Sequence, residues 1–119
     1  MRPDVVFAHW PVDTHIDHQL TGVMALRVFL DKESRFALYF FEVMTGRQSL
    51  HFRPTHHVDI SAYREIKKAA MFAHASQNPA GFWAHHEVMD AFRGKECGCE
   101  AAEAFLKAGT APPDPLAAW

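Results

Sequence analysis

Apolar runs alternate with amphipathic stretches along this chain, and the alternation predicts strands interleaved with helices. Residues 4–9 form a short apolar run rich in β-branched and aromatic side chains, which is typical of a buried strand. Residues 36–41 are apolar throughout and predict a second strand that is buried on both faces. Glu42 closes that strand and is expected to be an exposed turn carboxylate. Residues 57–60 predict a further short strand.

The first predicted helix follows Pro11. Thr14 is its expected cap, and Asp17, three residues later, completes a capping-box spacing. The helix is expected to continue to about Leu30, with an apolar surface wide enough to pack on a sheet.

Two more helices are predicted over residues 61–77, with Ser61 as the cap, and over residues 83–93, ended by Gly94. Residues 101–106 fit either a helix or a strand by pattern alone. The alternating order predicts an α/β fold, with helices layered on a partly parallel sheet.

The length of 119 residues suffices for one domain and is too short for two. We expect residues 1–108 to form that domain. Residues 109–119 contain three prolines and are expected to be a frayed or extended tail.

Composition describes an ordinary soluble globular protein, with 49% hydrophobic and 22% charged residues. The net charge of -2 gives no electrostatic reason to expect nucleic acid or an anionic membrane as a partner. Neither a membrane-spanning run nor a signal-type apolar core is evident, so a cytoplasmic location is expected. Cys97 and Cys99 are too close in sequence for an unstrained disulfide and are expected to be free thiols.

Residues 13–18 hold two histidines and two carboxylates where a strand should give way to a helix. His15 and His18 are three residues apart and would share one helix face, with Asp17 between them to orient an imidazole. His9 and Asp13 would face the same crevice. A zinc hydrolase needs about three protein ligands, a carboxylate base and a group that stabilises an oxyanion. Capping alone would also explain Asp and Thr at a helix start, so both interpretations stand at this point.

These residues resemble the second signature of the PIG-L family, the LmbE-like zinc-dependent N-acetylglucosaminyl deacetylases. The matching residues are Pro3-Asp4-Val5-Val6-Phe7 and His9-Trp10-Pro11-Val12-Asp13-Thr14-His15-Ile16-Asp17-His18. The resemblance continues in order through Phe40-Phe41-Glu42, residues 55–60, Lys67-Lys68, His74-Ala75-Ser76-Gln77, Phe92-Arg93-Gly94 and Ala102-Glu103-Ala104-Phe105.

The resemblance implies a role for each residue of the motif. His18 corresponds to a zinc ligand, and His15 to the histidine that, when protonated, stabilises the oxyanion and assists the leaving amine. Asp17 corresponds to the carboxylate that tunes that histidine, and Asp13 matches a frequent family position near the site. Ile16 stands where the family usually has proline, which removes no chemical group.

The family's first signature, His-Pro-Asp-Asp-Glu, supplies two further zinc ligands and the aspartate base, and it does not occur in this sequence. The resemblance therefore implies the C-terminal part of a Rossmann-like layered sheet with helices on both faces, truncated at the N-terminus relative to the family. It also implies a hydrolase that acts on an N-acetylated amino-sugar conjugate, with zinc as its cofactor. We expect this chain to be inactive alone. We also expect it to form a homo-oligomer through an uncovered apolar sheet edge and helix-packing face, or else to be poorly soluble.

Two other interpretations remain open. In the first, the chain is a non-catalytic, self-associating α/β module that derives from the family. In the second, His9, Asp13, His15 and His18 hold a metal by themselves, which requires a tight approach of His9 to the helix.

Overall fold

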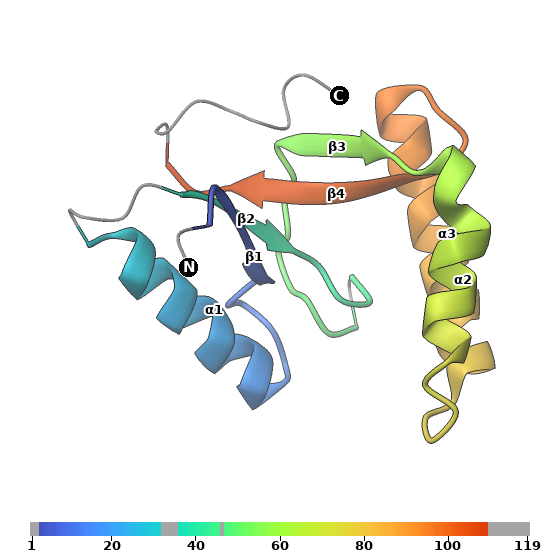
Figure 1. Cartoon of the computed structure of the whole chain (residues 1–119), viewed down its shortest axis with the longest axis horizontal. Helices are drawn as coiled ribbons and strands as arrows, with labels where there is room; N and C mark the ends of the chain where they lie inside the picture. Colours follow the sequence, from blue (N-terminus) through green and yellow to red (C-terminus); the bar gives the residue numbers. More distant parts are fainter. Residues whose placement is uncertain (1–2, 32–35, 46, 110–119) are drawn as a thin grey trace. The chain divides into compact units, whose positions relative to one another are not determined.

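The computed structural model describes residues 3–31, 36–45 and 47–109, in which strands and helices alternate (Figure 1). The elements in chain order are β1 (Val5–His9), α1 (Ile16–Phe29), β2 (Ala37–Phe41), β3 (His56–Asp59), the short 3-10 helix η1 (Ser61–Tyr63), α2 (Arg64–Phe72), α3 (Pro79–Cys97) and β4 (Ala102–Lys107).

The strands form one sheet in the order β1-β2-β4-β3. Strands β1 and β2 are parallel, with Val5 opposite Ala37 and His9 opposite Phe41, whereas β4 runs antiparallel to β2. The predicted α/β class with a partly parallel sheet is therefore confirmed. The ambiguous segment near residues 101–106 is a strand.

The described chain divides into two compact units, and β4 contributes to both. The first unit comprises the described residues up to His56 and from Ala104 onward, and the second comprises His57–Glu103.

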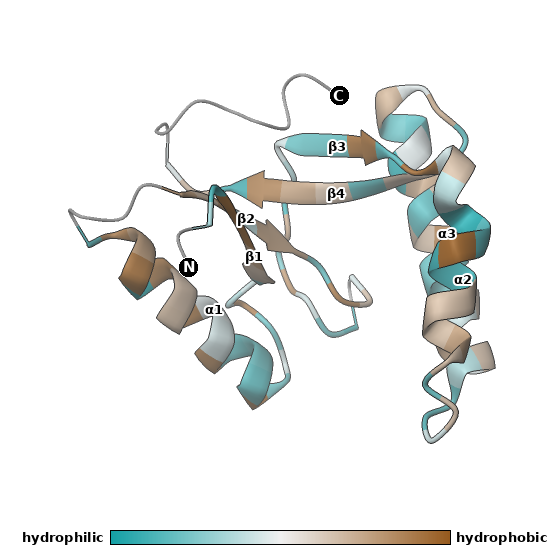
Figure 2. Ribbon diagram, viewed as in Figure 1, coloured by the Kyte–Doolittle hydropathy of each residue, from teal (hydrophilic) through white to brown (hydrophobic). Residues whose placement is uncertain are grey.

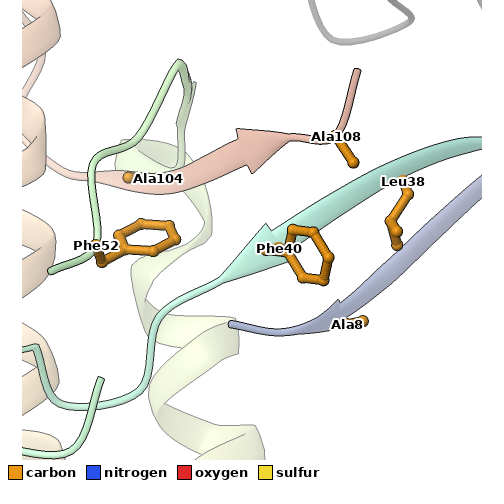
Figure 3. Close-up of a cluster of buried hydrophobic side chains, with 6 residues drawn as sticks. All are labelled: Ala8, Leu38, Phe40, Phe52, Ala104 and Ala108. Atoms are coloured by element: carbon orange, nitrogen blue, oxygen red, sulfur yellow. The ribbon is translucent and has the colours of Figure 1, made fainter. Parts of the chain in front are cut away.

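The core of the first unit is a cluster of buried side chains from β1, β2, β4 and the segment before β3 (Figure 3). Its members are Ala8, Leu38, Phe40, Phe52, Ala104 and Ala108. Ala8 lies opposite Phe40 in the sheet, and Leu38 shares the face of Phe40 because side chains alternate along a strand. Leu26 and Phe29 of α1 pack against this cluster. The burial of β2, which is complete or nearly so from Ala37 to Phe40, agrees with its uninterrupted apolar sequence.

Gly22 determines how closely α1 approaches the end of β1. A Cβ atom at this position would lie 2.5 Å from the carbonyl oxygen of His9 and 3.1 Å from Cα of Pro11. Only glycine permits this approach, which holds the first half of α1 against the loop that follows β1.

The outer surface of α1 is also apolar. Leu20, Val23 and Met24 are 55%, 55% and 68% exposed, and their spacing places them on one helix face. Figure 2 shows hydrophilic residues at the start of α1 and hydrophobic residues toward its end.

In the second unit, charged groups connect α2, α3 and β4. Nζ of Lys67 lies 2.9 Å from Oδ1 of Asp90 and 2.7 Å from Oε1 of Glu103. Asp90 is only 2% exposed. Its Oδ2 and the Nδ1 of His86 are buried without a hydrogen-bond partner among the described residues.

The first helix does not begin as the capping pattern predicts. His15, not Thr14, is the cap, and its side chain accepts the backbone N–H of Asp17. The backbone N–H of Thr14 instead donates to the carbonyl oxygen of Gln48. The expected capping box is therefore wrong, because a contact with a distant loop holds Thr14.

The second helix is shorter than predicted. Ser61 lies in η1, where its hydroxyl donates to Asp59, and α2 begins only at Arg64 without a side-chain cap. It ends at Phe72 rather than near Gln77.

The third helix is longer than predicted at both ends. Asn78 caps it through a hydrogen bond to the N–H of Gly81, and Pro79 occupies its first turn. Gly94 lies inside the helix rather than at its end. A glycine is needed there because a Cβ atom would lie 2.7 Å from the carbonyl oxygen of Cys99. Gly98, with a φ of 85°, is the residue that ends the helix.

Glu42 is 7% exposed, so the expected exposed turn carboxylate is wrong. Of the predicted tail over residues 109–119, residues 110–119 lie outside the described residues. No helix in the described part of the chain has the length and apolar character needed to cross a membrane.

Candidate functional site

The candidate site lies where β1 ends and α1 begins. His9 is the last residue of β1, and the chain then passes through a loop that a second loop holds in place. The N–H of Leu50 donates to the carbonyl oxygen of Val12 at 2.9 Å, and Asp13 pairs with Ser49 in an isolated antiparallel bridge. These contacts fix the loop that carries the histidines.

Asp13 is the anchor of the site and is only 6% exposed. Its Oδ1 accepts the backbone N–H of His15 at 2.8 Å and lies 3.1 Å from Nδ1 of His18. Its Oδ2 accepts the hydroxyl of Ser49 at 2.9 Å. Burial favours the neutral acid, but these hydrogen bonds and the charge on His18 outweigh it, so the pKa of Asp13 is lowered. The carboxylate is therefore ionised and held at the centre of the site.

The contact with Asp13 determines which nitrogen of His18 is free. An ionised carboxylate only accepts hydrogen bonds, so Nδ1 of His18 carries the proton and donates to Oδ1. In the neutral ring, Nε2 then keeps its lone pair, which is the form in which histidine binds a metal. The amide nitrogen of Gln48 lies 3.3 Å from the same Nδ1, but the anionic carboxylate is the stronger acceptor.

Three histidine rings stack at this position. The ring centroids of His9 and His18 are 4.1 Å apart, and those of His15 and His18 are 4.8 Å apart. Burial lowers the pKa of His9, the neighbouring His18 and His15 lower it further, and Asp13 opposes them. Burial and the two neighbouring imidazoles therefore favour the neutral form of His9.

His15 takes the opposite protonation pattern from His18. Its Nδ1 accepts the backbone N–H of Asp17 at 3.2 Å, which leaves the proton of the neutral ring on Nε2. The carboxylate Oδ2 of Asp17 lies 3.8 Å from the same Nδ1, with both side chains largely exposed. In the neutral ring of His15, Nε2 is therefore the N–H donor, and this ring lies against that of His18.

The sequence-predicted site residues His9, Asp13, His15, Asp17 and His18 are thus brought together. A zinc ion needs about three protein ligands, and among these residues His18 could supply one through Nε2, because Asp13 contacts its Nδ1. No group of three or more His, Cys, Asp and Glu side chains among the described residues is arranged to hold a metal. The interpretation in which this cluster holds a metal by itself therefore gains no support.

Sequence reasoning missed Ser49 and Gln48. They lie 36 and 30 residues along the chain from their respective partners, Asp13 and His18. A lone serine or glutamine in a loop carries no pattern that would mark it as part of a site.

Comparisons with known proteins agree with this architecture. No protein-family model and no curated protein matches the sequence. The structure is similar to that of the conserved protein TT1542 from Thermus thermophilus, with 26% identity, a TM-score of 0.74 and coverage of 96% of this chain and 56% of the other. It is also similar to the N,N'-diacetylchitobiose deacetylase from Pyrococcus horikoshii, with 25% identity, a TM-score of 0.69 and coverage of 90% and 46%.

The chain has a deacetylase-like fold. It spans about half the length of the two solved structures, 56% of one and 46% of the other. The likeness to a deacetylase supports a hydrolase-like fold for this chain.

Proposed function

We propose that this chain carries one half of a zinc-dependent N-deacetylase site, which acts on an N-acetylglucosaminyl-type substrate. The observation that carries the proposal is the pair of adjacent histidines with opposite tautomers. Asp13 contacts Nδ1 of His18 and so leaves Nε2 of that ring available, whereas Nδ1 of His15 accepts the backbone N–H of Asp17. A deacetylase among the similar structures supports the same reaction class.

Each residue then has a role in amide hydrolysis. His18 would be a zinc ligand through Nε2. His15 would donate a hydrogen bond to the oxyanion that forms when the amide carbonyl is attacked. Asp17, whose carboxylate lies 3.8 Å from Nδ1, would orient the ring of His15, which would pass a proton to the leaving amine. The chemistry that zinc supplies in such hydrolases is Lewis acidity and activation of water.

The described residues do not complete this site. The remaining metal ligands and the carboxylate base would have to come from outside them, and the resemblance to the deacetylase family implies a His-Pro-Asp-Asp motif as their source. We therefore expect the 119-residue chain to release no acetate from an N-acetylglucosaminyl substrate when zinc is added. Zinc-dependent release by the purified chain would show that its own residues complete the site.

Zinc binding to the isolated chain tests whether His18 is a metal ligand. Titration with zinc, followed by NMR of the histidine rings, should perturb the ring of His18 before those of His51 and His74, which lie elsewhere. His18→Ala should remove the strongest response, and His74→Ala should leave it unchanged. Equal responses from all three rings would remove His18 from any metal site.

A chimaera tests the reaction. The part of the Pyrococcus deacetylase that has no counterpart in this chain would be fused to residues 1–119, and acetate release from N,N'-diacetylchitobiose would be measured. Activity that is lost in His18→Ala and His15→Ala, but kept in His74→Ala, would support the proposal. A folded chimaera that binds zinc but releases no acetate would contradict it.

A second candidate is a non-catalytic, self-associating α/β module. The exposed apolar face of α1, formed by Leu20, Val23 and Met24, favours it, as does the lack of three convergent ligands among the described residues. The DNA immediately upstream of the Met1 codon distinguishes the two candidates. An in-frame His-Pro-Asp-Asp sequence would favour the enzyme, and its absence would favour the module.

A further inference from the structure

The segment Cys97-Gly98-Cys99 ends α3 and lies in the second unit, away from the histidine cluster in sequence. Gly98 adopts a left-handed conformation with a φ of 85°. The N–H groups of Gly98 and Cys99 both donate to the carbonyl oxygen of Gly94, at 2.8 and 2.9 Å. This tight reversal of the chain brings the two cysteine sulfurs together, with 3.5 Å between the Sγ atoms.

Both sulfurs are also held by the backbone. Sγ of Cys97 donates to the carbonyl oxygen of Arg93 at 3.4 Å, and Sγ of Cys99 donates to that of Ala101 at 3.3 Å. Burial raises the pKa of Cys99, and the neighbouring Cys97 and the carboxylate of Asp59 raise it further. A thiol that resists ionisation is a slow nucleophile, so this pair is poorly suited to thiol–disulfide catalysis.

Both thiols are free, Cys97 is exposed and Cys99 is partly exposed, so an incoming ligand can reach them. Two sulfurs are too few for a tetrahedral zinc site, and no third ligand converges on them among the described residues. Soft ions, in contrast, prefer sulfur to nitrogen and oxygen and are satisfied by fewer ligands.

We propose that Cys97 and Cys99 form a preorganised dithiol site for a soft, thiophilic ion of the trivalent arsenic class. The reaction with an organic arsenoxide is balanced without an oxidant. Two S–H bonds and the As–O bonds break, two As–S bonds form, and the arsenoxide oxygen leaves with both protons as one water molecule.

Phenylarsine oxide is the direct probe, because it forms a stable product only with two thiols. The reduced protein should take up one equivalent, seen as a single adduct by intact-protein mass spectrometry. Dithiothreitol should release the adduct, and an equal concentration of thiol groups as β-mercaptoethanol should not. Release by both reagents alike would show that only one sulfur is bound.

Single substitutions test whether both sulfurs bind the arsenic atom. Cys97→Ser and Cys99→Ser should each weaken binding by about a hundredfold, because the second attachment is lost. Far-UV circular dichroism of each variant confirms that its fold is kept. Affinity in either variant within a few-fold of wild type would overturn the dithiol site.

Unfolding tests the preorganisation. In a urea concentration that unfolds the protein, affinity for phenylarsine oxide should fall by about tenfold, because the two sulfurs are no longer held together. A small peptide dithiol in the same urea corrects for the effect of solvent. Equal affinity in the folded and the unfolded chain would overturn the proposed role of the helix end.

Discussion

Nδ1 of His18 lies 3.1 Å from Oδ1 of Asp13, a carboxylate that is itself only 6% exposed. The same carboxylate accepts the N–H of His15 and the hydroxyl of Ser49. One buried side chain therefore holds the start of α1, the loop after β2 and the ring of the candidate metal ligand. Loss of Asp13 should affect both the stability of the fold and the orientation of His18.

Asp13→Asn should destabilise the protein by about 1–3 kcal/mol at pH 7, because an amide cannot accept all three hydrogen bonds that the carboxylate accepts. The pKa of Asp13 is lowered from 3.8, so its contribution is present above pH 3.8 and is lost as the pH falls through the folded-state pKa. The difference between wild type and variant should therefore shrink near pH 3. Urea unfolding at both pH values measures it, with the exposed Asp4→Asn as the control. A difference that does not depend on pH would contradict this account.

Gly22→Ala should destabilise the protein although alanine is the better helix former. The intrinsic helix preference gains about 1 kcal/mol. The added Cβ, however, would lie 2.5 Å from the carbonyl oxygen of His9, and moving α1 away costs about 1–3 kcal/mol. Thermal unfolding should show a lower Tm for this variant, whereas Val23→Ala on the exposed face should change Tm little. An increase in Tm would show that α1 does not need the close approach.

Lys67→Met should be strongly destabilising, because it leaves the buried carboxylate of Asp90 without its cation. Removal of one partner of such a pair costs about 3–5 kcal/mol. The double variant Lys67→Met/Asp90→Leu should return to within about 1 kcal/mol of wild type, because an apolar pair of similar size replaces the charges. Glu103 is 41% exposed as a side chain and can be solvated without Lys67. Chemical unfolding of the two single variants and the double variant measures this coupling, and additive losses would contradict it.

The pH dependence of the same pair follows from burial. Burial raises the pKa of Asp90 above 3.8, and Lys67 opposes that rise. A raised carboxyl pKa contributes stability at low pH, which is lost as the pH rises through the folded-state pKa. Lys67→Met removes the opposing cation, so its destabilisation should be smaller at pH 5 than at pH 8. Asp90→Asn should abolish this pH dependence, and its persistence in that variant would exclude Asp90 as the cause.

The sequence is sufficient to predict those elements whose signal is local. The uninterrupted apolar run of β2 predicts a buried strand because few other arrangements bury every side chain. Helix ends are predicted less well. Gly94 has the local signature of a stop, but its lack of a side chain serves a close approach to Cys99 instead.

In the candidate site, too, features set by neighbouring residues can be predicted, whereas features set by distant contacts cannot. His15, Asp17 and His18 lie within four residues of one another, so their proximity follows from the chain itself. The hydrogen bond from Ser49 to Asp13 joins residues 36 apart, and no periodic pattern encodes it. The protonation state of His18 depends on that distant support for Asp13, so the residue types of the site can be predicted from the sequence but its tautomers cannot.

Self-association is expected through the apolar face of α1. Leu20 and Met24 are one helical turn apart and are 55% and 68% exposed, and a second copy of the chain would remove them from water. Leu20→Glu/Met24→Glu should therefore lower the weight-average mass in sedimentation equilibrium toward that of one chain. Val88→Glu, at a residue that is 70% exposed on α3, is the matched control and should leave the association unchanged. A wild-type protein that stays monomeric at high concentration would show that this face is not an interface between copies.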